Sequence, residues 1–291
     1  MELPPVLPPD ESAPPPVTPV PSMTVSSDSG SAIWMALALT VIYVVLLIVL
    51  QSVLTVVLMV LKLPPPGAVV TTVLMFGAFG VTLGLTPLLT GLPIRELLPG
   101  RPGPAAAIPG AVLLALGGWI GALEIGALTE QVMPMPEWIA REFERLFQQS
   151  HPVASLVLLT VAPPIVEEAL CRGLLLRAML KRWSVTRSVV VSALVFGGIH
   201  LNPWQFFYAT WLGLLLGWVY VRTRSLGLCV LLHALNNFLS WVLMRAQPEW
   251  AGSGSAVPEH LPVGWAAAGV ALLMGGVLWL RKVPVVGKAE S

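Results

Sequence analysis

Two adjacent glutamates and an arginine lie inside an apolar run of the chain, as Glu167, Glu168 and Arg172. Ionised groups at membrane depth cost at least a few kcal/mol each unless they are paired or face a cavity, so the cluster indicates a functional site. On a helix that turns about 100° per residue, Arg172 lies roughly 40° from Glu168 and about 140° from Glu167. The spacing predicts an ion pair of Glu168 with Arg172, the acid being N-terminal, and leaves Glu167 free for chemistry. An ion pair that only holds two helices together is the simpler alternative.

Two other apolar segments contain histidines, His200 and His233. Counted at 1.5 Å per residue from the nearest basic flank, Glu167, His200 and His233 lie at depths of about 15, 20 and 14 Å. Asn237 follows His233 by one helical turn, and Phe196 precedes His200 by one turn. Three separate helices are therefore expected to bring an acid and two imidazoles to one membrane layer. For either histidine taken alone, an interhelical hydrogen bond is the alternative.

This set of side chains is suited to hydrolysis. A carboxylate in a dry site can act as a general base, neutral imidazoles can hold water or a metal, and an amide can stabilise an oxyanion. The chain contains no His-Glu-x-x-His and no Gly-x-Ser-x-Gly, and its only aspartates, Asp10 and Asp28, precede the first apolar run. Their absence excludes a zinc protease with a His-Glu-x-x-His motif, a serine protease with a Gly-x-Ser-x-Gly motif and an intramembrane aspartyl protease. A Cys171–His protease stays a minor alternative.

The composition is that of an integral membrane protein. The 291 residues are 56% hydrophobic and 11% charged, with a mean hydropathy of +0.82, whereas soluble proteins average roughly 25% charge. The net charge of +1 argues against nucleic acid as a partner. Cys171 and Cys229 both fall in apolar segments and are expected to be small buried residues.

The order of apolar runs predicts an all-α fold, a polytopic membrane bundle of about eight transmembrane helices. The runs lie near residues 33–61, 68–90, 105–128, 153–176, 188–201, 204–220, 226–244 and 263–280. We expect a disordered Pro- and Ser-rich tail over 1–31, one membrane-embedded domain over 32–283 with its motif-bearing core at 152–245, and a short tail over 284–291. The fifth run is short, and its turn at Asn202-Pro203 is expected to lie within the membrane beside a cavity.

The distribution of Lys and Arg predicts the orientation. With the N-terminus inside, cytoplasmic segments hold eleven Lys and Arg residues and opposite segments hold four. This bias predicts that both termini are cytoplasmic. The membrane is expected to be the cell (inner) membrane. Residues 136–150 are predicted to form an amphipathic helix on the opposite surface. We expect a water-filled cavity that is open to the cytoplasm and closed on the far side by this helix.

In their order and spacing, three motifs resemble those of the CPBP group, which contains the type II CAAX prenyl endopeptidases and the bacterial Abi-type intramembrane proteases. The motifs are Glu167-Glu168-x-x-x-Arg172, Phe196-x-x-x-His200 and His233-x-x-x-Asn237. The resemblance runs from Pro152 to Arg245, about a third of the chain, and implies a glutamate-dependent endopeptidase of the membrane. A bundle of eight spans agrees with that family's architecture.

The resemblance also implies a role for each residue. Glu167 would activate a water, His200 and His233 would position that water or a divalent metal such as zinc, and Asn237 would polarise the scissile carbonyl. Glu168 and Arg172 would support them, and Glu167, His200 and His233 are the candidate metal ligands. The expected partners are membrane lipid and a membrane-anchored or lipidated peptide or protein substrate. A proton-coupled transporter and a non-catalytic immunity or scaffold protein of the same fold are the alternatives.

Overall fold

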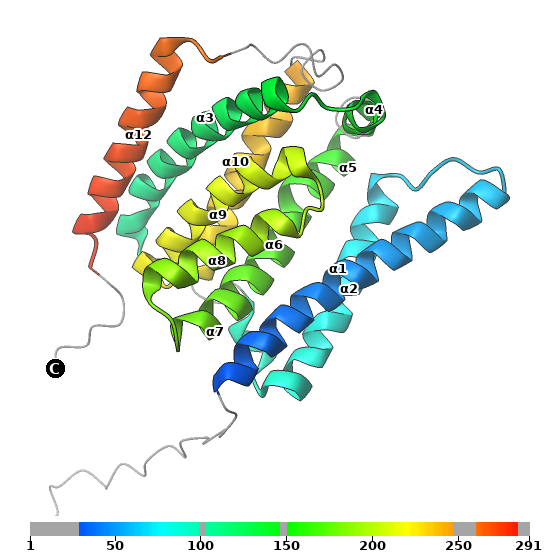
Figure 1. Ribbon diagram of the computed structural model, residues 1–291, viewed down its shortest axis with the longest axis horizontal. Helices are drawn as coiled ribbons and strands as arrows, with labels where there is room; N and C mark the ends of the chain where they lie inside the picture. The colour runs from blue at the N-terminus through cyan, green and yellow to red at the C-terminus, as the bar shows by residue number, and fades with distance from the viewer. Residues whose placement is uncertain (1–28, 99–102, 146–149, 247–259, 285–291) are drawn as a thin grey trace, which may run out of the picture.

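The computed structural model describes residues 29–98, 103–145, 150–246 and 260–284, and the regular elements in these ranges are all helices (Figure 1). The longer helices are α1 (Ser29–Val60), α2 (Ala68–Thr90), α3 (Ile108–Val132), α8 (Val185–Gly198), α9 (Pro203–Thr223), α10 (Leu226–Ala246) and α12 (Val263–Lys282). Two short 3₁₀ turns, η1 (Ile94–Glu96) and η2 (Ala105–Ala107), precede α3. The predicted terminal tails lie almost wholly outside the described residues, although α1 begins before the expected boundary at residue 31.

Within these described ranges, six helical segments are long and apolar enough to cross a membrane, which indicates a multi-pass membrane protein. Each of the eight predicted runs is helical, but α8 is shorter than a span and α9 is less apolar than the six, so the count of about eight is not confirmed. Burial separates the helices into two kinds. Half of the apolar window within 152–180 is buried, against 28% for α1 and 17% for α12. Exposed apolar surface of this extent is stable where lipid surrounds it.

The helices alternate in direction, so the bundle has two end faces (Figure 1). We call one the basic face. It contains the first residue of α1, the turn between α7 (Arg177–Leu180) and α8, the turn between α9 and α10, and the end of α12. We call the other the α4 face. It contains the end of α3, the helix α4 (Glu137–Glu144), the start of α9 and the end of α10.

The helix that carries the two glutamates, Pro152–Leu180, which we call the glutamate helix, is irregular along its length. It runs through α5 (Pro152–Leu156), the π-helical turns η4 (Val157–Val161), α6 (Ala162–Glu168), the π-helical turns η5 (Ala169–Leu176) and then α7. Pro163 and Pro164 remove two backbone N–H donors from its middle. Wide π-helical turns within a helix are frequent at functional sites.

The turn between α8 and α9, at Asn202-Pro203, lies at the α4 face. Its location within the membrane stays a prediction. Leu201 adopts a left-handed backbone conformation with φ of 51°, and the Asn202 side chain caps α9 by accepting from the backbone N–H of Trp204 at 3.0 Å. The Trp204 indole N–H donates to the Met133 carbonyl at 2.6 Å, which fixes the turn to the end of α3. The predicted amphipathic helix is present as α4. Residues 146–149 of that prediction lie outside the described residues.

Candidate active site

Glu168 and Arg172 form the ion pair that their spacing predicts. The Arg172 Nη1 atom donates to Glu168 Oε1 at 2.8 Å, and both side chains are almost fully buried. The other terminal nitrogen of Arg172 donates to the Gly213 carbonyl at 2.9 Å, and its guanidinium carbon lies 4.5 Å from the centre of the Phe196 ring. The arginine therefore connects the glutamate helix to α9 and α8, which balances the cost of burying its charge.

His233 lies between the two glutamates, which the sequence analysis did not foresee. Its Nδ1 donates to Glu168 Oε1 at 2.9 Å, and its Nε2 lies 3.9 Å from Glu167 Oε2. Because a carboxylate accepts, the contact with Glu168 places a hydrogen on Nδ1 and leaves the Nε2 lone pair facing Glu167. Glu168 thus orients the imidazole as well as pairing with Arg172.

Glu167 differs from Glu168 in its contacts. Its Oε2 atom is buried, and the described residues give it no hydrogen-bond partner. The same holds for Glu168 Oε2, but Glu168 Oε1 accepts two hydrogen bonds and its side chain does not line the cavity. The distance of 3.9 Å to His233 Nε2 is too long for a direct hydrogen bond but leaves room for one water bonded to both atoms. A buried carboxylate oxygen without a partner is costly, so a water or a substrate group at this point would be stabilised.

His200 belongs to the turn after α8, and its ring is also held by one nitrogen. Its Nδ1 donates to the Phe196 carbonyl at 2.8 Å, so its Nε2 is an acceptor. The rings of His200 and His233 both pack edge-on against the Phe196 ring, each with a centroid separation of 5.4 Å. Phe196 is fully buried and thereby sets the positions of both imidazoles and of Arg172. The sequence analysis quoted Phe196 as part of a motif without giving it this role.

The Asn237 side chain hydrogen-bonds to the backbone of the glutamate helix. Its Nδ2 donates to the Leu159 carbonyl at 3.0 Å. In an α-helix that carbonyl would accept from Pro163, and in a π-helix from Pro164, but neither proline has an N–H. The Asn237 amide supplies the donor that both prolines lack, and its second N–H remains for another acceptor. A proline pair four and five residues after Leu159 was a visible signal for this contact.

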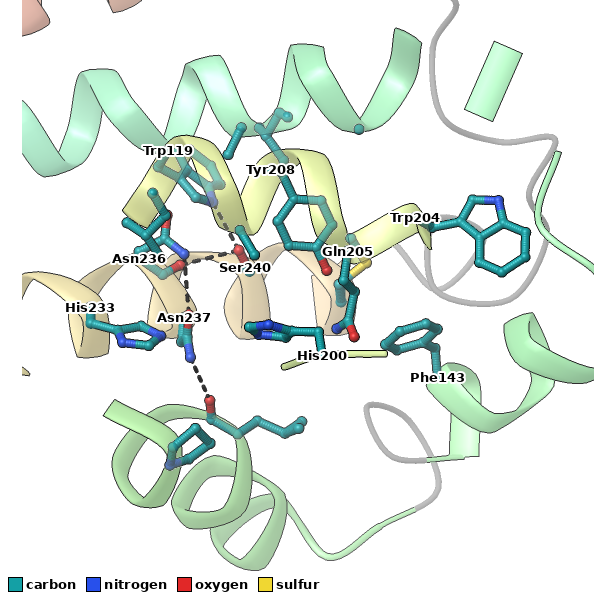
Figure 2. A pocket seen from close by; sticks show the side chains of 18 of the residues that line it. Trp119, Phe143, His200, Trp204, Gln205, Tyr208, His233, Asn236, Asn237 and Ser240 are labelled. Carbon is teal, nitrogen blue, oxygen red and sulfur yellow. Dashed lines mark hydrogen bonds between the residues drawn. The ribbon is translucent and has the colours of Figure 1, made fainter. Parts of the chain in front are cut away.

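A chain of polar contacts continues from Asn237 along α10 (Figure 2). Asn236 Nδ2 donates to Asn237 Oδ1 at 3.1 Å, and the Trp119 indole N–H donates to Ser240 Oγ at 3.1 Å. Asn236 Oδ1 is buried and has no partner among the described residues. Asn236, Ser240 and Trp119 were not predicted as site residues, because contacts between α3 and α10 cannot be read from either segment alone.

Four of the six predicted residues line one cavity of about 400 Å³, namely Glu167, His200, His233 and Asn237. Figure 2 shows the two imidazoles and the Asn237 amide together in it. Glu168 and Arg172 do not line it and lie behind His233 and Phe196. The rest of the wall is mainly apolar and aromatic. It includes Trp119, Phe143, Trp204, Tyr208 and Leu212.

The cavity extends in the direction opposite to the one predicted. Beyond the site residues themselves, its walls come mainly from the α4-face halves of α3, α9 and α10, together with Ala140 and Phe143 of α4. No residue of α7 or of the described turn after it lines the cavity. The expectation that it opens toward the basic segments is therefore wrong. Leucines of η5, such as Leu174, Leu175 and Leu176, fill that side of the glutamate helix and are fully buried.

The two imidazoles resemble metal ligands in one respect, because each has Nδ1 hydrogen-bonded and Nε2 unoccupied by protein. However, the described residues contain no group of three or more His, Cys, Asp or Glu side chains that could hold a metal ion. Glu167, His200 and His233 as a zinc set thus stay a prediction. Cys171 and Cys229 are unpaired and buried, as expected, and neither lines the cavity.

Comparisons with known proteins agree with the motif resemblance. No curated protein and no solved structure matches the chain. Residues 149–239 match the model of one protein family, described as type II CAAX prenyl endopeptidase Rce1-like. All six predicted site residues fall within this range. The match covers the glutamate helix and α8 to most of α10, and it indicates the activity of an intramembrane endopeptidase. Over residues 149–239, which contain all six predicted site residues, the chain is therefore similar to the Rce1-like type II CAAX prenyl endopeptidases.

Proposed function

We propose that the protein is an intramembrane endopeptidase in which Glu167 activates a water to hydrolyse a peptide bond of a membrane-associated substrate. The observation that carries the proposal is the pair of unsatisfied acceptors, Glu167 Oε2 and His233 Nε2, which face each other across 3.9 Å at the wall of the cavity. A water between them would donate one hydrogen to each. Its oxygen lone pairs would then be directed at a substrate carbonyl.

The chain's own residues account for the proton transfers. Glu167 accepts a proton from the water while the oxygen attacks the carbonyl carbon, and a tetrahedral intermediate forms. Glu167 then gives the proton to the amide nitrogen as the C–N bond breaks, which yields a carboxylic acid and an amine. His233 holds the water and is itself held by Glu168, which accepts from its Nδ1. The second N–H of Asn237 and the His200 ring are the nearest candidates to bind the substrate carbonyl.

The family match supports a membrane-associated peptide as substrate, and the family's name points to a prenylated one. The cavity is consistent with both a lipidated and an unmodified peptide, because its walls are mostly apolar and a few polar groups converge at one end. A divalent metal at the imidazoles is a separate proposal. If present, it would polarise the water or the substrate carbonyl.

The test is cleavage of membrane-anchored peptides by the purified protein, with prenylated and unmodified peptides in parallel. Glu167→Gln removes the base but keeps the shape, so we expect turnover to fall at least a hundredfold, within the range for general-base catalysis. Glu130→Gln is the matched control. Glu130 also lines the cavity, and its Oε1 accepts from the Met135 backbone N–H, which the glutamine oxygen can also do.

A result in which Glu167→Gln retains activity within tenfold of the wild type would overturn the role of Glu167. Metal analysis of the active protein and assays with a chelator complete the experiment. Full activity of metal-free protein would remove zinc from the proposal and leave the glutamate mechanism intact. Loss of activity that added zinc restores would assign His200 and His233 to the metal.

A further inference from the structure

The cavity connects the site to one end of the bundle. From Glu167 and His233 it runs along α3, where Ala122, Gly126 and Glu130 line it one turn after another toward the end of the helix. At the far end it reaches α4 and the start of α9, where Phe143 and Trp204 form its wall (Figure 2). The side chains along this path are half-buried for the most part, as expected for the wall of an open cavity.

The opposite side of the site is closed by packing. Between the glutamates and the basic face, Leu174, Leu175 and Met179 are at most 1% exposed. On α9 the matching positions are Leu216 and Val219, which are buried in a neighbouring core cluster together with Leu176. The cavity therefore extends from the site toward the α4 face, and none of the described residues of the basic face lines it.

The charge distribution distinguishes the two faces. Of the fourteen Lys and Arg residues in the described ranges, nine lie at or near the basic face and four at or near the α4 face, and Arg172 is in the core. Lys181, Arg182 and Arg224 lie in short turns between helices, and Arg222 lies in the last turn of α9. Positive charge in short loops close to helix ends is retained on the cytoplasmic side of a membrane.

Combining these two observations, we infer that the cavity opens to the non-cytoplasmic side and that the site receives its substrate from there. The substrate class is then a peptide segment anchored in the outer leaflet or projecting from it. Its scissile bond reaches Glu167 through the α4 face. This inference rests on the proposed endopeptidase function for its substrate, but the sidedness of the cavity stands on the packing and the charges alone.

Cysteine labelling tests the inference with three single variants of the full chain. Gly126→Cys places a thiol in the cavity, at a position where an added Cβ meets no atom within 4 Å. Val263→Cys marks the α4 face, because Val263 is 84% exposed at the start of α12. Thr186→Cys marks the basic face, in the exposed first turn of α8. The unmodified chain is the blank, since Cys171 and Cys229 are fully buried.

A charged, membrane-impermeant maleimide is applied to spheroplasts and to inside-out vesicles of an expressing bacterium. We expect Gly126→Cys and Val263→Cys to react at least tenfold faster in spheroplasts, and Thr186→Cys to react at least tenfold faster in inside-out vesicles. Reaction of Gly126→Cys from the same side as Thr186→Cys would overturn the direction of the cavity. If all three variants react faster in the opposite preparation to the one expected, the orientation of the protein is overturned. If Gly126→Cys is labelled from neither side, the cavity is closed and the inference is overturned.

Labelling requires no cleavage, so its result is separate from that of the peptide assay. Cleavage together with labelling of Gly126→Cys from the cytoplasmic side would keep the endopeptidase and reject its sidedness. Labelling as expected with no cleavage by the wild type would keep the sidedness and reject the endopeptidase. In an active preparation, labelled Gly126→Cys should also lose cleavage, because the adduct occupies the path to Glu167.

Discussion

The two sides of the site are built differently, although the same helices form both. Toward the basic face, Glu168 and Arg172 are fully buried and bound to each other, to His233 and to the Gly213 carbonyl. Toward the α4 face, Glu167 Oε2 and Asn236 Oδ1 have no partners among the described residues and lie at a cavity. Glu168 Oε2 and Arg172 Nε also have no partners among the described residues, but neither side chain lines the cavity. The packed side holds the geometry, and the hollow side presents its unpaired acceptors to a space that a ligand can occupy.

This difference separates two adjacent glutamates into two roles. Glu168 binds Arg172 and His233 through one oxygen, Oε1, and its contribution is orientation of His233. Its other oxygen, Oε2, is buried without a partner among the described residues, but Glu168 does not line the cavity. Glu167 is one residue further toward the cavity, and its free oxygen is available to a water. A site that must bind and release a substrate needs both kinds of residue, because unpaired groups hold their positions only when their neighbours are rigid.

Breaking the packed side should have the largest effect on stability. Arg172→Leu leaves Glu168 charged and without its partner, so we expect the free energy of unfolding to fall by about 3–5 kcal/mol. Arg141→Leu is the matched control, because Arg141 and Glu137 form an ion pair of the same spacing at 3.0 Å with both side chains exposed. Its loss should cost about 0.3–0.5 kcal/mol. Thermal unfolding of the two variants in detergent makes the measurement.

The double variant Glu168→Gln/Arg172→Met removes both charges. It shows whether Arg172→Leu is destabilised by an unpaired charge or by the loss of side-chain volume. We expect it to be more stable than Arg172→Leu, because no unpaired charge remains in the core. Equal stability of Arg172→Leu and Arg141→Leu would show that the buried pair does not form in the membrane.

A smaller loss is expected where the two sides meet, at Asn237. Asn237→Ala leaves the Leu159 carbonyl without a donor, which should cost about 1–3 kcal/mol of unfolding free energy. Pro163→Ala provides the control, since it restores an N–H four residues after Leu159. In that background Asn237→Ala should cost less, by about 1 kcal/mol of coupling energy. Additive effects of the two substitutions would show that Asn237 does not replace the missing backbone donor.

The sequence was sufficient for features that depend on local periodicity. The apolar runs predicted helices near their observed bounds, and the spacing of Glu168 and Arg172 predicted their ion pair, because both follow from one helix. Matched depths predicted that Glu167, His200 and His233 approach one another, and all three line the cavity. The contact of His233 with Glu168 was missed because it joins residues 65 positions apart. Only the packing of α10 against the glutamate helix determines it.

The direction of the cavity was predicted wrongly for a physical reason. The basic flanks give the depth of a residue along its helix but not the side on which neighbouring helices separate. Here α3, α9 and α10 leave space at their α4-face halves, whereas leucines of η5 fill the other side. The number of spans was likewise open, because α9 combines a spanning length with tryptophans, Gln205 and Arg222 that lower its hydropathy.

The smallest expected effects compare one glycine from each side. At Gly213, an added Cβ would lie 2.9 Å from the Ala193 Cα atom, where α8 and α9 pack closely. Gly213→Ala should gain about 0.5–1 kcal/mol from helix propensity but lose about 1–3 kcal/mol to overpacking. The net result is a loss of up to about 2.5 kcal/mol, accompanied by weaker cleavage, because the Gly213 carbonyl also binds Arg172.

At Gly126 an added Cβ meets no atom within 4 Å, so the same propensity gain should appear undiminished in Gly126→Ala and raise its unfolding temperature. Unfolding of both variants under identical detergent conditions makes the comparison. Equal destabilisation by the two alanines would mean that the α3 wall is packed in the membrane, which would contradict an open cavity at Gly126.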